Sequence, residues 1–188
     1  MVLSAANSRL KVIVIGAGPA GLCTATALRQ EGYSVTILER RRDAQPHGHA
    51  LVIQPAAVRA LQHLKGADKA FSRVSVDAGA LRWWSYRDNK PFAIPLPAET
   101  MPYYERRFQT DRPSVQKVLN ELAVANGVEL LFGRAVQGVE DNGAKPKLWT
   151  THGETFTADL IVAADGMSDI GLMEAASSVL RIDPPNPI

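Results

Sequence analysis

The sequence predicts an α/β fold: a Rossmann-like βαβ unit, joined to a small inserted sheet and an antiparallel β-meander. Three features predict the βαβ unit. Residues 12–15 are an unbroken run of β-branched residues, which is typical of a strand buried on both faces. A glycine-rich turn and a helix follow, with Pro19 in the first helical turn and Gly32 where a left-handed cap is expected. Residues 35–38 then form a second buried strand.

The glycine-rich turn has the spacing of a phosphate-binding loop. Gly16 permits the tight turn out of the strand, Gly18 leaves room for a pyrophosphate against the backbone, and Gly21 lets the helix pack closely on the sheet. The helix N-terminus offers free N–H groups to the phosphates. Glu39 ends the second strand, where it is placed to accept hydrogen bonds from a ribose diol. This register predicts dinucleotide binding; the alternative is a glycine-rich turn in which Glu39 is merely solvated.

The bulk composition indicates an ordinary globular protein. The 188 residues allow one domain, or one domain and part of another. A formal charge of +2 gives no reason to expect nucleic acid or a membrane surface as a partner. Residues 40–42 are three arginines, which we interpret as a solvated loop or as one contact to the phosphate side of a cofactor. Cys23, the single cysteine, is expected to be a packed side chain rather than a nucleophile.

No targeting or membrane segment is recognised. The first nine residues lack the apolar core of a signal peptide, and no apolar run is long enough to span a bilayer. We therefore expect a cytoplasmic protein without a membrane span. No metal site is assigned.

The middle of the chain alternates between helical and strand patterns. Residues 50–53 predict a strand, Pro55 opens a helix that ends near Gly66, and residues 67–71 predict a short helix. Residues 80–86 and 91–96 predict an aromatic hairpin. Its aromatic side chains either line an apolar pocket for an aromatic substrate or form the hydrophobic face of the hairpin; they are Trp83, Trp84 and Tyr86.

The second half predicts a return to the first sheet. An apolar stripe from Val115 to Leu122 predicts a helix starting at Arg112, and residues 128–132 predict a strand. Residues 135–140, 147–151 and 155–158 predict the antiparallel meander. The buried strand 160–164 is expected beside residues 12–15. We expect no regular structure in the proline-rich end of residues 171–188 beyond one or two helical turns.

Four motifs in this order resemble the FAD-dependent aromatic monooxygenases of the para-hydroxybenzoate and salicylate hydroxylase type. Residues 12–22 with Glu39 resemble the FAD fingerprint of that family, and residues 48–55 resemble its second flavin-contacting loop. Asp111-Arg112 resembles its FAD-contacting arginine, and residues 164–168 resemble its Asp-Gly segment. The first motif is common among flavoproteins, whereas all four in order are much more specific.

The resemblance implies FAD as cofactor, NADPH or NADH as reductant, and O2-dependent hydroxylation of a small aromatic substrate. It assigns eight cofactor-binding residues, which are Gly16, Gly18, Gly21, Glu39, Gly48, Ala50, Arg112 and Asp165. The alternatives are a surface arginine for Arg112 and a turn cap for Asp165. No catalytic acid or base is assigned, because the family's substrate-side residues lie outside the matched part. The oligomeric state and the substrate stay open.

The resemblance stops near Ser168, where the family usually continues with Val-Arg and this chain does not. We expect a C-terminally truncated member that binds FAD weakly and shows little turnover. Expected boundaries are residues 1–73 and 108–170 for the FAD-binding domain, 74–107 for a substrate-side insertion, and 171–188 for a divergent tail. Two alternatives remain: a non-catalytic dinucleotide-binding remnant, and an NAD(P)-binding reductase, which Arg112 and Asp165 disfavour.

Overall fold

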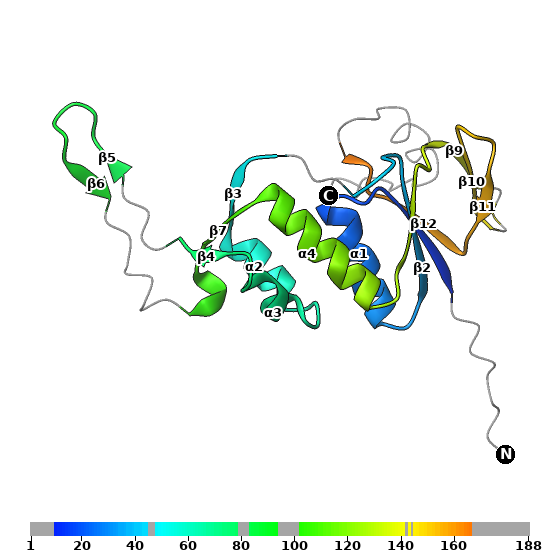
Figure 1. Ribbon diagram of the computed structural model, residues 1–188, viewed down its shortest axis with the longest axis horizontal. Helices are drawn as coiled ribbons and strands as arrows, with labels where there is room; N and C mark the ends of the chain where they lie inside the picture. Colours follow the sequence, from blue (N-terminus) through cyan, green and yellow to red (C-terminus); the bar gives the residue numbers. More distant parts are fainter. Residues whose placement is uncertain are drawn as a thin grey trace, which may run out of the picture. The chain divides into compact units, whose positions relative to one another are not determined.

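A computed structural model describes residues 10–44, 48–78, 83–93, 102–141, 143 and 145–166. These residues fall into two compact units (Figure 1). The first unit contains the chain up to Ala44 and again from Ala123, and the second runs from Gln45 to Leu122. The predictions for the tail after residue 170, for Ser168 and for residues 80–82 and 94–96 lie outside the described part.

The first unit is built on a four-stranded parallel sheet in the order β12-β1-β2-β8. Its strands are β1 (Lys11–Ile15), β2 (Ser34–Glu39), β8 (Glu129–Phe132) and β12 (Leu160–Ala163). Val12 is level with Leu160, and Ile15 is level with Ala163. The return of the last strand to the side of β1 is therefore confirmed. The carboxyl ends of β1, β2 and β12 meet at one edge, where ligands of parallel sheets bind.

Helix α1 (Pro19–Gln30) connects β1 to β2, as the βαβ pattern predicts. It begins with Pro at its first turn and buries Leu22 and Ala25. It ends in a Schellman-type cap, because Gly32 has a φ of +97° while Tyr33 N–H donates to the Leu28 carbonyl at 3.2 Å. The predicted left-handed glycine at this position is confirmed.

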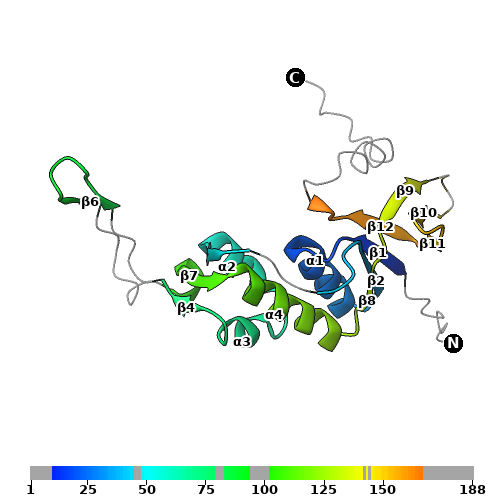
Figure 2. The same cartoon turned by 45° about the horizontal axis from the view of Figure 1, so that its top comes forward.

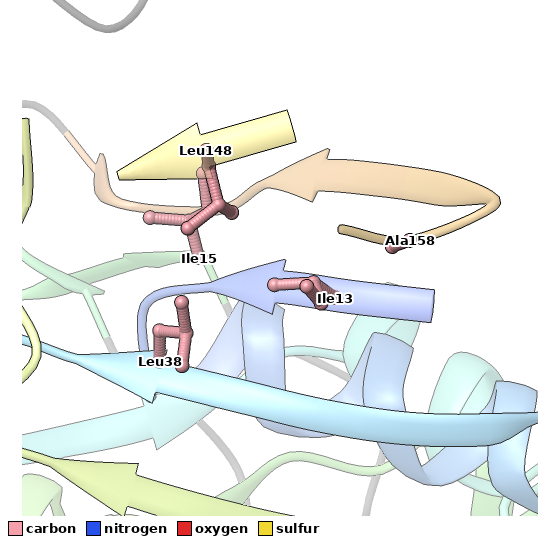
Figure 3. Close-up of a cluster of buried hydrophobic side chains, with 5 residues drawn as sticks. All are labelled: Ile13, Ile15, Leu38, Leu148 and Ala158. Carbon is pink, nitrogen blue, oxygen red and sulfur yellow. The ribbon is translucent and has the colours of Figure 1, made fainter. Parts of the chain in front are cut away.

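The antiparallel meander covers the face of the sheet opposite α1 (Figure 2). Its strands are β9 (Val136–Glu140), β10 (Lys147–Thr150) and β11 (Thr155–Thr157). Side chains from both layers meet in one buried cluster, in which Ile13, Ile15 and Leu38 face Leu148 and Ala158 (Figure 3). Burial of an isoleucine or leucine side chain is worth roughly 1.5–3 kcal/mol, so this cluster holds the meander on the sheet.

The second unit has a three-stranded antiparallel sheet in the order β3-β7-β4. Its sheet strands are β3 (Ala50–Ile53), β7 (Phe108–Asp111) and β4 (Val76–Asp77). Its helical elements are α2 (Pro55–Leu61), α3 (Ala67–Phe71), the short 3-10 helix η2 (Tyr103–Glu105) and the start of α4 (Arg112–Ala125). A separate two-stranded hairpin pairs β5 (Trp83–Trp84) with β6 (Pro91–Ala93). The predicted strand at residues 50–53 and helix at residues 67–71 have the predicted bounds.

Two features of the second unit differ from the prediction. Helix α2 ends at Leu61 rather than near Gly66, because Leu64 N–H bonds to the Leu61 carbonyl three residues back and tightens the chain into turns. Strands β4 and β7 were not predicted, since their sequences, Val-Asp and Phe-Gln-Thr-Asp, lack an apolar run or a full alternation. In the part of the chain that the structure describes, no helix is both long and apolar enough to cross a bilayer.

Candidate functional site

The turn between β1 and α1 depends on two glycines for its internal packing. Gly16 has a φ of +100°, and a Cβ at this position would lie 2.6 Å from the Ala164 carbonyl oxygen. A Cβ on Gly21 would overlap the Gly16 carbonyl oxygen, and it would lie 3.4 Å from the Ala164 Cβ. The close packing expected of Gly21 is therefore mainly against the turn itself. Both glycines let the turn fold tightly against the end of β12.

Gly18 differs from its two neighbouring glycines because a Cβ there would meet no atom within 4 Å. Its backbone is extended, with φ −74° and ψ 173°, which any residue adopts. It is the N-cap of α1 and makes no side-chain hydrogen bond to the first-turn N–H groups, which an α-helix leaves without intrahelical partners. Gly18 is thus not required by the fold, and its missing side chain leaves a cradle at a helix N-terminus.

Glu39 is held beside the turn by both carboxylate oxygens. Oε2 accepts a hydrogen bond from the Ala17 N–H at 2.7 Å, and Oε1 accepts one from the Arg41 N–H at 2.9 Å. Glu39 is therefore not merely solvated, and its contact with a dinucleotide stays a prediction. The fold therefore places the Glu39 carboxylate against Ala17, the residue before Gly18, and each of its oxygens keeps a second lone pair for another donor.

Asp165 follows β12 and lies next to the same turn, since its Cα is 3.0 Å from the position of a Cβ on Gly16. Its Oδ2 is buried and has no hydrogen-bond partner among the described residues. A buried carboxylate oxygen without a donor is rare and requires an explanation. Oδ2 makes no bond that would cap a turn, so the turn-cap alternative gains no support.

The remaining three predicted residues come together within the second unit. Gly48 has a φ of +140°, and a Cβ there would lie 2.7 Å from Cδ of Arg112. The Arg112 N–H donates to the His49 carbonyl at 3.0 Å, and Ala50 is level with Asp111 between β3 and β7. Arg112 itself is exposed, as the surface-arginine alternative also expects, so its contact with a cofactor stays a prediction.

The start of α4, which carries Arg112, is fixed by a cap that the sequence analysis missed. Asp111 Oδ1 accepts from the Ser114 N–H at 2.8 Å, and Oδ2 accepts from the Ser114 hydroxyl at 2.8 Å. The spacing Asp-x-x-Ser before an apolar stripe was the available signal for this cap. Without it, the first turn of α4 and the backbone of Arg112 would fray.

Two further side chains were singled out by sequence. Cys23 is half-buried in α1, and burial raises the pKa of its thiol, which keeps it protonated and agrees with a packing role. In the aromatic hairpin, Trp84 is 53% exposed and Tyr86 is fully exposed, while the Trp83 side chain lies outside the described part. An apolar pocket of the second unit is lined by other residues, among them Phe71 and Phe108. The hairpin is confirmed, but its first strand ends at Trp84 rather than at Tyr86. Neither Trp84 nor Tyr86 lines that pocket.

Comparison with known families and proteins gives a consistent result. The family model described as FAD binding domain matches residues 9–171. The chain is 30% identical over 161 residues to an FAD-dependent urate hydroxylase of Klebsiella pneumoniae, covering 84% of this chain and 40% of that protein. It is 31% identical over 163 residues to 3-amino-4-hydroxybenzoate 2-monooxygenase of Streptomyces cremeus, covering 86% and 41%.

The solved structures agree on the fold. A mutant of 2-methyl-3-hydroxypyridine-5-carboxylic acid oxygenase superposes with a TM-score of 0.70 at 25% identity, covering 85% of this chain and 40% of that one. The chain thus spans about 40% of the length of the relatives that it matches.

Proposed function

The chain belongs to the FAD-binding domain family, and from this premise we propose that the turn from Gly16 to Gly21 binds the pyrophosphate of FAD. The observation that carries the proposal is the open space at Gly18, because the fold makes no use of the missing side chain there. A pyrophosphate needs close approach to backbone N–H groups at a helix N-terminus, and a side chain at this position would block it.

The chemistry of the neighbouring side chains fits the same cofactor. FAD carries ribose and ribityl hydroxyls, which are hydrogen-bond donors, and both carboxylates near the turn have acceptor capacity left. Glu39 retains lone pairs beyond its two backbone bonds, and Asp165 has a buried Oδ2 without a partner. We assign Glu39 to the ribose diol and Asp165 to a cofactor hydroxyl or to a water on the pyrophosphate.

We further propose that Arg112 supplies a cation to FAD, with Gly48 and Ala50 shaping the backbone around it. The support comes from contacts among neighbouring residues of the second unit. Gly48 is the residue type that allows the Arg112 stem to lie against the chain, and the Asp111 cap fixes the backbone of Arg112. A guanidinium gives charge-assisted hydrogen bonds to phosphate or carbonyl oxygens.

For the whole protein we propose an FAD-dependent monooxygenase that hydroxylates a small aromatic substrate. The support is the chemistry named for its relatives, a urate hydroxylase and an aminohydroxybenzoate monooxygenase. When bound and reduced by NADH or NADPH, FAD supplies the chemistry that activates O2. The residues of this chain bind and orient the cofactor. A second candidate is FAD binding without turnover, because the chain spans about 40% of these relatives.

The test is an FAD titration of the chain, followed by flavin absorbance and by fluorescence quenching. We expect Gly18→Val to weaken FAD binding by more than about a hundredfold, or about 2.7 kcal/mol. Its circular dichroism and unfolding midpoint should stay unchanged because the added side chain enters open space. Ala125→Val is the control, since it introduces the same valine side chain at an exposed position at the end of α4.

Retention of FAD by Gly18→Val would overturn the phosphate-binding assignment. NADH or NADPH oxidation with candidate phenols, with H2O2 and hydroxylated product measured separately, distinguishes the two candidate functions. Product formation that matches reductant consumption supports the monooxygenase, and flavin binding without product supports the second candidate.

A further inference from the structure

Glu39 has a role at the turn that its contact with a ribose does not cover. We propose that Glu39 is a positioning residue: its carboxylate fixes the Ala17 N–H, and thereby the shape of the glycine turn, before any nucleotide binds. The proposal deepens the proposed function and rests on it, because the turn that Glu39 shapes is the one assigned to the pyrophosphate.

The geometry of the carboxylate carries the inference. The bond from Ala17 N–H to Oε2 is 2.7 Å long, which is in the range of charge-assisted hydrogen bonds. Ala17 is only 6% exposed, so little water competes for this N–H. On the other side, Oε1 accepts from Arg41 N–H, which limits the rotation of the carboxylate. Both oxygens are therefore oriented without a ligand.

The backbone of Glu39 is anchored as well as its side chain. Its carbonyl accepts from the Arg134 N–H at 2.8 Å, and the residue is level with Phe132 between β2 and β8. A carboxylate on a paired strand is a firm point of attachment. The turn is thus tied to the end of β2 at two successive amides, since the Gly16 N–H donates to the Leu38 carbonyl at 2.8 Å.

The turn needs such ties because glycine has the largest conformational freedom of all residues. Gly16 and Gly18 flank Ala17, so neither neighbour has a side chain to restrict the turn. A turn that is ordered before binding does not lose that entropy when the pyrophosphate arrives, which raises affinity. Loss of the carboxylate should therefore weaken every ligand that uses the turn, including one without ribose hydroxyls.

The test compares ADP with 2′,3′-dideoxy-ADP, which keeps the pyrophosphate and lacks the diol. Affinities are measured by calorimetry for the unaltered chain, Glu39→Gln and Glu39→Ala. We expect Glu39→Ala to weaken dideoxy-ADP by about tenfold and ADP by more. Glu39→Gln keeps one acceptor oxygen but turns an NH2 toward one of the two backbone amides, so it should lie between. Glu140→Ala, which removes an exposed carboxylate on β9, is the control and should change neither ligand.

A second readout needs no ligand. In ¹⁵N-resolved NMR spectra of the free chain, Glu39→Ala should speed hydrogen exchange of the Ala17 amide by at least about tenfold. Amides of α1 serve as the internal reference for an intact fold.

The outcomes separate the two proposals. If the unaltered chain binds neither FAD nor ADP, the proposed function fails, and the Ala17 exchange rate still decides whether Glu39 orders the turn. If Glu39→Ala weakens ADP but leaves dideoxy-ADP unchanged, Glu39 acts through the ribose alone and the inference is overturned. An Ala17 amide that exchanges equally in both proteins overturns it as well.

Discussion

Two aspartates flank β12, one at each end, and their carboxylates differ in their hydrogen-bond partners. Asp159 precedes the strand, and both of its oxygens have partners: the Lys11 N–H at 2.7 Å and the Lys145 ammonium at 3.0 Å. Asp165 follows the strand, and its Oδ2 is buried without a donor among the described residues. Among the described residues, the carboxylate at the amino end of β12 thus has a partner for each oxygen, whereas the carboxylate at the carboxyl end has a buried oxygen without a donor.

This difference separates a structural carboxylate from a candidate ligand-binding one. Asp159, just before β12, accepts a hydrogen bond from the Lys11 N–H at the start of β1 and so links the two paired strands. This backbone bond, together with Lys145, lowers the pKa of the Asp159 carboxyl. Among the described residues, Asp165 Oδ2 makes no comparable bond, and Asp165 lies at the edge where parallel sheets bind ligands. An unsatisfied polar atom at that edge is better evidence for a ligand than a motif alone, since no contact among the described residues accounts for it.

The largest effect is expected at the carboxyl end, where Gly21→Ala should prevent normal packing of the turn. The new Cβ would overlap the Gly16 carbonyl oxygen, and backbone atoms cannot move aside as flexible side chains do. We expect a loss of about 3 kcal/mol in the free energy of unfolding, the upper end of the usual cost of overpacking, measured by urea denaturation. Gly18→Ala is the matched control, with a change within about 1 kcal/mol because its Cβ enters open space. Equal stabilities for the two variants would contradict the distinction between a structural and a ligand-facing glycine.

The parts of the fold that could be predicted from the sequence are those whose signals are local. The βαβ unit was predicted because its signals are local: an apolar run, a proline at a helix start and a glycine at a helix end. The site residues at the turn followed from the same motif. Strands β4 and β7 were not predicted because they are short and polar, and because they are stabilised by strand pairing, β7 with β3 and β4 with β7, rather than by their own pattern.

Contacts between distant residues were equally out of reach. Gly48 and Arg112 were named separately by resemblance, and only the fold brings the Arg112 stem against Gly48. The partners of Glu39 were missed because they are backbone N–H groups, which no sequence pattern marks. The same holds for Asp165, since a missing hydrogen bond is a property of the packed structure.

The two aspartates can be compared directly by the same substitution. Asp165→Asn should lower FAD affinity by about tenfold, because the carboxylate acceptor is replaced by a neutral group of the same shape. The stability of the FAD-free chain should not fall, since Oδ2 loses no hydrogen bond. Isothermal titration with FAD and urea denaturation without it give the two readouts. Asp159→Asn should leave FAD affinity unchanged, and a loss of affinity in that variant would remove the contrast between the two ends of the sheet.

The smallest effect is a pH dependence at the amino end of β12. The pKa of Asp159 is lowered from its ordinary value of 3.8, first by the Lys11 backbone bond and then by Lys145. As the pH falls below 3.8, the unfolded chain takes up a proton that the folded chain still refuses, so the stabilisation by this carboxylate is lost as the pH falls through the folded pKa. Above 3.8 the stabilisation is fully present.

Urea denaturation between about pH 2 and pH 7 should therefore show that Asp159→Asn lowers the free energy of unfolding at neutral pH. The difference in stability between this variant and the unaltered chain should narrow in acid. Lys145→Met should keep part of this pH dependence, because it leaves the larger contribution from Lys11 in place. Parallel stability curves for the unaltered chain and Asp159→Asn at all pH values would mean that the Lys11 bond does not hold this end of the sheet.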